Sequence, residues 1–217
     1  MLALAPDLGR RVGSILCVGA HSDDIEIGCG GTLLTLLDDA PNVTVDWVVL
    51  SAEGARAEEA HRAAEKIAGA GDRVRVRVAA FPERFFPAAY ADLKHWFDAL
   101  GRDIRPDLVF APRTADVHQD HRTTAELVWQ TFRDQPVLEY EIVKYEGDLG
   151  QPNAYVALDD ATAQRKLDLL SEVFATQRGR DWFDDSTFRA IMRLRGVECR
   201  APSGYAEAFH ASKLRLR

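Results

Sequence analysis

Short apolar runs alternate with amphipathic segments along the first two thirds of the chain. Three mostly apolar runs have the composition of strands buried on both faces: residues 12–18, 43–50 and 107–111. Between them, apolar residues recur every three or four positions, which predicts helices over residues 32–37, 57–68 and 90–104. Residues 73–78 alternate strictly between Arg and Val, which predicts a strand at a sheet edge with one exposed face.

The pattern continues and then weakens in the last third. Ala125, Val128 and Phe132 share one face of a predicted helix that follows residue 121. The remaining predicted elements are strands at 138–145 and 154–158 and a helix over 163–174. From Arg178 onward the chain is aromatic and charged with weaker periodicity, and we predict no element there.

The alternation of strands and helices predicts the fold class. It indicates an α/β protein with a doubly wound, mostly parallel, Rossmann-like sheet and helices on both faces. We expect a single domain over residues 1–217, because the chain contains no repeat, low-complexity tract or linker. The commonest strand order, 3-2-1-4-5, would place the first and fourth strands side by side at the point where ligands bind.

Imidazole and carboxylate groups gather where two predicted strands end. The two clusters are His21, Asp23 and Asp24 after the first strand, and His118, Asp120 and His121 after the fourth. The predicted strand order brings both clusters to one crevice at the carboxyl ends of the strands. Convergence of groups nearly a hundred residues apart favours a functional site over a solvated loop.

Composition narrows the possible partners. Hydrophobic residues make up 47% and charged residues 28%, as in a soluble globular protein, and the net charge of −7 disfavours nucleic acid as a partner. The three cysteines fit neither a disulfide framework nor a cysteine-rich metal site. No stretch resembles a signal peptide or a membrane span, so we expect a cytoplasmic protein.

The residue types suggest metal-assisted hydrolysis. His21, Asp24 and His121 form a two-His, one-carboxylate set that suits Zn²⁺, or another exchangeable divalent ion, with a position left for water. Asp23 is then free to accept the proton of the attacking water, and His118 to stabilise the oxyanion or protonate the leaving nitrogen.

Two further acids stand beside these residues. Asp120 either caps the following helix or orients a ligand histidine, and Asp116 is either structural or part of the surroundings of the ligands. The capping and structural interpretations stay open for both.

The motifs resemble those of the PIG-L/LmbE-type zinc-dependent N-deacetylases. That family carries Ala-His-Pro-Asp-Asp with a following glycine pair and Thr, and the corresponding stretches here are 20–24 and 30–32. Its second motif, His-x-Asp-His, corresponds to 118–121, and weaker similarities lie at Lys166, 176–177 and 205–209. The resemblance implies removal of an acetyl group from an N-acetylated amino sugar or conjugate. It also implies the roles given above and a possible homo-oligomer.

Two departures from the family pattern concern the rim of the site. Ser22 replaces the family proline, which removes a rigid φ angle but no catalytic group. The loop after the second strand is shorter than in many relatives. We expect Glu53 and Arg56 on this rim to contact the substrate; the alternative is that they belong to a solvated helix start.

Three other functions fit parts of the sequence. The glycines at 28, 30 and 31 suggest a dinucleotide site but lack the Gly-x-Gly-x-x-Gly spacing. The 116–121 stretch resembles the metallo-β-lactamase motif, yet only His210 remains downstream as a further histidine. A non-catalytic sugar- or nucleotide-binding module is the third alternative, and its lack of a metal distinguishes it from an enzyme.

Overall fold

The computed structural model describes residues 11–69 and 71–213, and its strands form one seven-stranded sheet. The strand order is β3-β2-β1-β4-β5-β7-β6. The parallel part comprises β1 (Ser14–Gly19), β2 (Thr44–Val49), β3 (Val74–Val78), β4 (Leu108–Pro112) and β5 (Val137–Tyr140). The predicted α/β class and the 3-2-1-4-5 order are therefore confirmed, with β3 at the edge as its Arg–Val alternation indicated.

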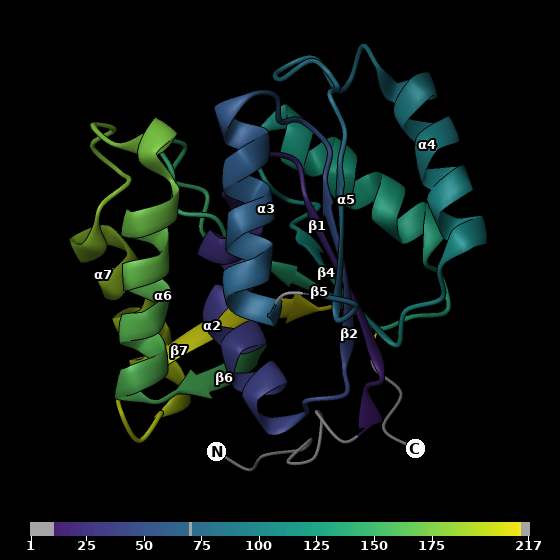
Figure 1. Cartoon of the computed structure of the whole chain (residues 1–217). Coiled ribbons are helices and arrows are strands. Elements are labelled where there is room, and N and C mark those ends of the chain that lie inside the picture. The colour runs from purple at the N-terminus through teal and green to yellow at the C-terminus, as the bar shows by residue number, and fades with distance from the viewer. Residues whose placement is uncertain (1–10, 70, 214–217) are drawn as a thin grey trace.

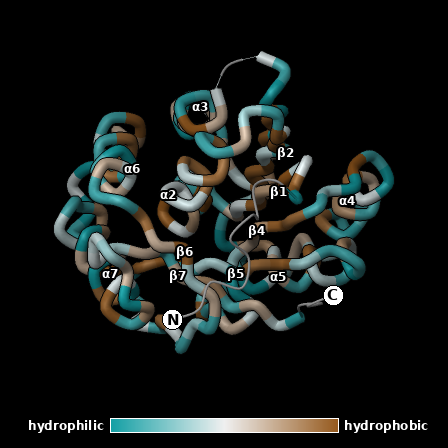
Figure 2. The backbone as a smooth tube through the Cα atoms, turned by 90° about the horizontal axis from the view of Figure 1, so that it is seen from below, coloured by the Kyte–Doolittle hydropathy of each residue, from teal (hydrophilic) through white to brown (hydrophobic). Residues whose placement is uncertain are grey.

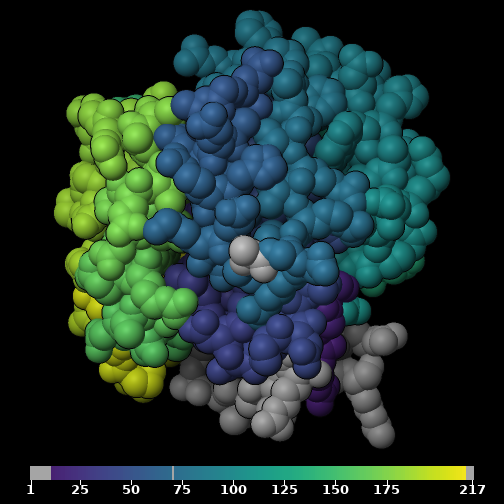
Figure 3. Space-filling view, in the orientation of Figure 1, coloured from purple at the N-terminus to yellow at the C-terminus, as the bar shows by residue number. Residues whose placement is uncertain are grey.

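Helices cover the two faces of the sheet unequally (Figures 1 and 2). One face carries α2 (Asp24–Asp39), α3 (Ala55–Ala68), α6 (Asp160–Val173) and α7 (Asp185–Cys199). The other carries α4 (Tyr90–Asp103) and α5 (Gln119–Thr131), which pack over a separate apolar cluster. In the space-filling view, the blue segment that includes α3 and the green segment that includes α6 hide most of the sheet (Figure 3). No helix in the described ranges is both long enough and apolar enough to cross a membrane.

The end of the chain contains two elements that the sequence pattern did not predict. Helix α7 is followed by β7 (Tyr205–Ala211), which inserts antiparallel between β5 and β6 (Ala154–Leu158). The helix was missed because Leu194 and Val197 are exposed on its outer side and blur the amphipathic pattern. The strand was missed because Glu207, a charged residue, is buried in its middle.

Two predicted boundaries are also corrected. The strand expected over 138–145 ends at Tyr140, and residues 141–153 form neither helix nor strand. The helix expected over 32–37 begins at Asp24, so it includes the glycine-rich stretch. Gly28 is required there, because a Cβ atom would lie 2.1 Å from the ring of Tyr140. Glycine thus allows α2 to lie directly against the end of β5.

Candidate active site

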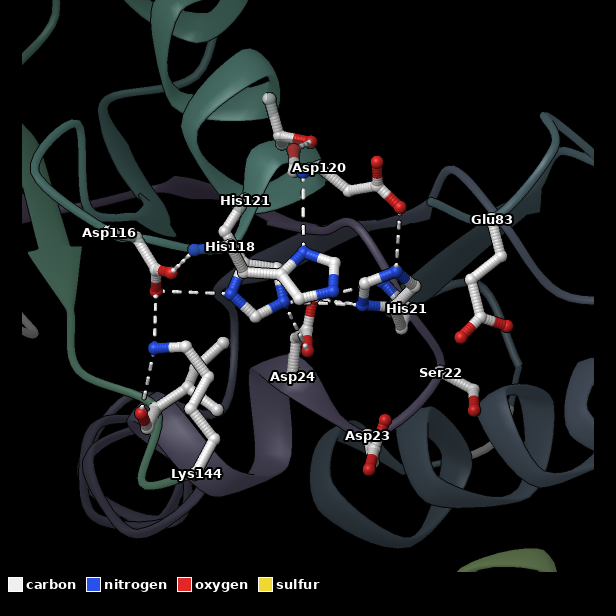
Figure 4. A network of polar contacts seen from close by, with 12 residues as sticks. His21, Ser22, Asp23, Asp24, Glu83, Asp116, His118, Asp120, His121 and Lys144 are labelled. Atoms are coloured by element: carbon white, nitrogen blue, oxygen red, sulfur yellow. Dashed lines mark hydrogen bonds and ion pairs between the residues drawn. The ribbon is translucent and has the colours of Figure 1, made fainter. Parts of the chain in front are cut away.

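The two polar clusters meet at the carboxyl ends of β1 and β4. These strands pair in parallel, with Cys17 opposite Phe110, so the loops that follow them emerge side by side. His21 comes from the β1–α2 connection, Asp24 is the first residue of α2, and His121 comes from the first turn of α5 (Figure 4). All three side chains are buried.

Three side chains with potential metal-ligand atoms face one another in this cluster. The distance from His21 Nδ1 to His121 Nε2 is 3.2 Å. Asp24 contacts both rings, with Oδ1 at 3.4 Å from His121 Nε2 and Oδ2 at 3.7 Å from His21 Nδ1. The two imidazoles and one carboxylate therefore form a compact triangle of donor atoms.

A carboxylate on the far side of each ring determines which ring nitrogen carries the proton. His121 Nδ1 lies 3.0 Å from Asp116 Oδ2, and His21 Nε2 lies 3.2 Å from Asp120 Oδ2. Since a carboxylate only accepts hydrogen bonds, the neutral form of each ring places its proton there and its lone pair toward the triangle. This carboxylate–histidine arrangement is the one found around metal-binding histidines.

Asp120 is itself held by main-chain donors. The amides of Arg84 and Phe86, in the loop after β3, donate to it at 2.6 Å and 3.2 Å. The residue that caps α5 is His118, whose Nδ1 accepts the amide hydrogen of Asp120 at 3.3 Å. Of the two interpretations of Asp120, the contacts therefore favour orientation of His21 over capping.

The electrostatics of the triangle favour a bound cation. Burial by itself would lower the pKa of each histidine, but Asp24 and the outer carboxylates outweigh it and raise the pKa of His21 to about 10 and of His121 to about 9. Burial by itself would raise the pKa of Asp24, yet His121 and His21 hold it well below its ordinary value. Without a metal, protons must therefore supply the positive charge that this carboxylate attracts.

The donor set fits a divalent metal ion. Two buried imidazole nitrogens and a carboxylate oxygen match a catalytic zinc site with an open position. His118 is a geometric alternative to Asp24, since one atom from each of His21, His118 and His121 falls within a 4.8 Å group. However, the Nδ1 of His118 accepts a hydrogen bond, so its other nitrogen carries the proton in the neutral ring and is a donor.

His118 is half-buried and stacks on His121, with ring centroids 4.6 Å apart. Burial, followed by the neighbouring His121 and His21, lowers its pKa below the ordinary value. The lowered pKa favours the neutral ring, whose N–H group is on the nitrogen that does not contact the amide of Asp120.

Asp23 lies apart from the triangle, although it is adjacent to Asp24 in sequence (Figure 4). Asp23 is 5% exposed, and burial together with the charge of Asp24 raises its pKa. The closest cation is Arg56, whose Nη2 lies 3.8 Å from Asp23 Oδ1. A buried carboxyl with a raised pKa beside the candidate ligands is a candidate general base.

The two expected substrate contacts differ in position. Arg56 reaches the site, where it donates to Ser22 Oγ at 3.3 Å and to Glu83 Oε2 at 2.7 Å. Glu53 is exposed before α3, and no hydrogen bond within the described residues connects it to the cluster. Glu83 was not a candidate, because nothing in the local pattern of its loop distinguishes it from a solvated acid.

Two further residues near the site escaped the sequence interpretation. Lys144, in the irregular segment after β5, donates to Asp116 Oδ2 at 3.0 Å. Glu26 lies one turn along α2 from Asp23 and is buried, and burial raises its pKa well above the ordinary value. Neither carboxylate oxygen of Glu26 has a hydrogen-bond partner in the described part of the chain, in keeping with a neutral acid.

The fold and the site together define a class: doubly wound α/β proteins with a two-His, one-Asp cluster at the switch point of the sheet. A family model, PIG-L, with the description GlcNAc-PI de-N-acetylase, matches residues 16–132, more than half of the chain. The chain belongs to the PIG-L family.

Solved structures of low sequence identity share the fold. A conserved protein, TT1542, from Thermus thermophilus is 21% identical, with a TM-score of 0.72 over 95% of this chain and 97% of that chain. The N,N'-diacetylchitobiose deacetylase of Pyrococcus horikoshii is 20% identical, with a TM-score of 0.66 over 95% and 87% of the two chains. A 4-carboxy-2-hydroxymuconate hydratase from Pseudomonas putida KT2440 is 19% identical, with a TM-score of 0.68 over 93% and 97%.

Two alternatives from the sequence lose support. The single, mostly parallel sheet agrees with the PIG-L fold and not with a metallo-β-lactamase. His210, the remaining histidine for that alternative, lies on β7 opposite Glu139 and not among the candidate ligands. The place of a tight glycine turn for a dinucleotide is occupied by the polar cluster and the start of α2.

Proposed function

We propose that this protein is a metal-dependent hydrolase that removes the acetyl group from an N-acetylated amino sugar or amino-sugar conjugate, with Zn²⁺ as the metal. The observation that carries the proposal is the convergence of His21 Nδ1, His121 Nε2 and Asp24 with the ring protons on the opposite side. Membership of the PIG-L family and the deacetylase among the similar structures support the reaction class. Since a hydratase shares the fold, the donor set and not the fold alone carries the argument.

His21, Asp24 and His121 would hold the metal. A divalent cation bound there would polarise the amide carbonyl and favour the ionisation of water. Asp116 and Asp120 would keep the two rings in the tautomer that binds the cation.

The chain's own acid–base groups would then carry out the proton transfers. Asp23 would accept the proton of the water that attacks the amide carbonyl carbon, since it is buried, has a raised pKa and is not needed as a ligand. His118 would donate its N–H hydrogen bond to the carbonyl oxygen as negative charge develops there. When the carbon–nitrogen bond breaks, acetate and the free amine leave, and the proton held by Asp23 is available to the amine.

Arg56 would bind the substrate on the side of Asp23. Its guanidinium is partly exposed and already bridges Ser22 and Glu83, so it can exchange the exposed contact with Glu83 for a polar group of the substrate.

Acetate release from a panel of N-acetylated amino sugars, free and conjugated, tests the proposed reaction. The zinc-loaded protein should release acetate from at least one member, a chelator should abolish the release, and added zinc should restore it. Full activity in a sample verified as metal-free would overturn the mechanism. Stoichiometric zinc binding without acetate release from any member would overturn the reaction class.

A further inference from the structure

Lys144 is a buried cation that the proposed reaction does not use. It lies in the irregular segment 141–153, and its side chain is 8% exposed. Its ammonium group has three acceptors: Asp148 Oδ1 at 2.7 Å, Asp116 Oδ2 at 3.0 Å and the carbonyl oxygen of Ile142 at 3.4 Å. These contacts use all three of its hydrogens, so the position of the ammonium group is defined on every side.

The carboxylate that Lys144 holds is shared with the candidate metal site (Figure 4). Asp116 Oδ2 also receives the Nδ1 hydrogen of His121 at 3.0 Å, and Asp116 Oδ1 receives the amide hydrogen of His118 at 2.7 Å. One carboxylate therefore orients a proposed ligand and the residue that caps α5, and Lys144 neutralises its charge.

Asp148, the other acid bound by Lys144, fastens the same segment to the loop after β4. Its Oδ2 accepts the amide hydrogen of Val117, and its carbonyl oxygen accepts a hydrogen bond from Arg113 Nη1, both at 2.7 Å. Lys144 thus lies where segment 141–150 and the 113–118 loop are joined. Loss of this cation would remove the contact that joins the Asp116 and Asp148 carboxylates.

The two histidine arms of the site are supported differently. Asp120, behind His21, is held by two main-chain amides, whereas Asp116, behind His121, is held by one main-chain amide and the charged side chain of Lys144. A side chain can be replaced without loss of a backbone donor, so the His121 arm can be tested by mutation of a residue that does not touch the proposed ligands.

We propose that Lys144 is a positioning residue that acts through Asp116 to direct His121 and thereby sets the affinity of the site for its metal ion. The inference rests on the proposed function in one respect: His121 is taken as a metal ligand. Lys144 lies outside both motifs, and its contacts couple segment 141–150 to the candidate metal site.

Zinc affinity of the purified protein, measured by competition with a chromophoric chelator, tests this inference. Lys144→Met should weaken zinc binding by about 10- to 100-fold, the range for loss of a partner that orients a ligand. Lys144→Arg should recover part of the affinity, because a guanidinium still donates to Asp116. The matched control is Lys66→Met, since Lys66 forms an exposed pair with Glu172 at 2.8 Å and should bind zinc as the wild type does.

A double-mutant cycle distinguishes action through Asp116 from general disruption. In an Asp116→Asn background, Lys144→Met should cause little further loss of zinc affinity. Equal losses in both backgrounds, or unchanged affinity in folded Lys144→Met, would overturn the inference. Lys144→Gln serves if the Met variant does not fold, with wild-type affinity again contradicting the role. Absence of zinc binding by the wild type would instead overturn the proposed function itself.

Discussion

Helix α2 lies against buried charged groups at two places, and these two groups are built differently. At its N-terminal end Asp24 faces His21 and His121, with its carboxylate oxygens 3.7 Å from His21 Nδ1 and 3.4 Å from His121 Nε2. Two turns later the helix meets a buried ion pair in which Lys166 Nζ and Glu207 Oε1 are 2.6 Å apart. The same helix thus contacts one carboxylate that needs protons or a metal ion as its positive partner and one whose positive partner is a lysine of the protein.

The charges of Lys166 and Glu207 are paired with each other inside the protein. Lys166 also donates to the carbonyl oxygen of Ile27 at 2.6 Å, and Glu207 accepts the amide hydrogens of Gly31 and Thr32 at 2.9 Å and 2.6 Å. This pair and its main-chain contacts join α6 and β7 to α2. Burial and charge alone therefore do not identify a site, whereas the convergence of two imidazoles and a carboxylate on one point does.

The largest expected effect concerns Asp23. Asp23→Asn retains the shape and hydrogen bonding of the side chain but cannot accept a proton. Acetate release should fall by about 100- to 10,000-fold, the range that a general base supplies. Zinc stoichiometry and thermal stability should stay near wild type, whereas Asp24→Asn should bind zinc weakly and recover activity in excess zinc. Rescue by zinc of Asp23→Asn but not of Asp24→Asn would mean that the two roles are reversed.

Loss of the Lys166–Glu207 pair should lower the stability of the protein and leave the candidate metal site intact. Lys166→Met leaves Glu207 buried without its cation, which should lower the free energy of unfolding by about 3–5 kcal/mol. The double variant Lys166→Met/Glu207→Gln should recover part of that loss, since the amide still accepts hydrogen bonds. Denaturant titration measures the stability, and a chelator assay measures zinc affinity. A more than ten-fold loss of zinc affinity in the folded variant would contradict the separation of the two groups.

His118 and His121 should separate catalysis from metal binding. His121→Ala should lose zinc affinity, whereas His118→Ala should bind zinc and release acetate about 100- to 1,000-fold more slowly, as for loss of one oxyanion donor. Zinc stoichiometry and single-turnover rates measure the two effects. Equal loss of zinc in both variants would show that His118 is a ligand.

The stability of the metal-free protein should also depend on pH. His21 and His121 have folded-state pKa values raised to about 10 and about 9, against an ordinary value of 6.5. Between pH 6.5 and the folded-state pKa values, the folded state holds more protons than the unfolded state. The stabilisation by the two protonated histidines is therefore fully present below about pH 6.5 and is lost as the pH rises through about 9 and 10. The melting temperature of metal-free protein should therefore decrease over that alkaline window.

Bound zinc supplies the control for this measurement. It replaces the protons on the two rings, so zinc-loaded protein should show a smaller decrease over the same window. Identical pH profiles with and without zinc would contradict the exchange of protons for metal at these histidines.

Local sequence pattern determined the framework of this protein. The apolar runs predicted the parallel strands, because burial of strands on both faces imposes a composition that each segment records by itself. The commonest topology of doubly wound sheets then predicted their order. The motifs at 20–24 and 118–121 identified the family, and their places after β1 and β4 predicted convergence.

Only the tertiary structure decided how the polar groups are paired. Lys144 meets Asp116 across 28 positions, and Glu207 meets the amide of Gly31 across 176, distances at which spacing carries no signal. Strand β7 was hidden for the same reason, since Glu207 looks solvated until Lys166 is placed beside it. The local sequence shows whether each residue is apolar or charged. It does not show which distant residue will stabilise a charged side chain once that side chain is buried.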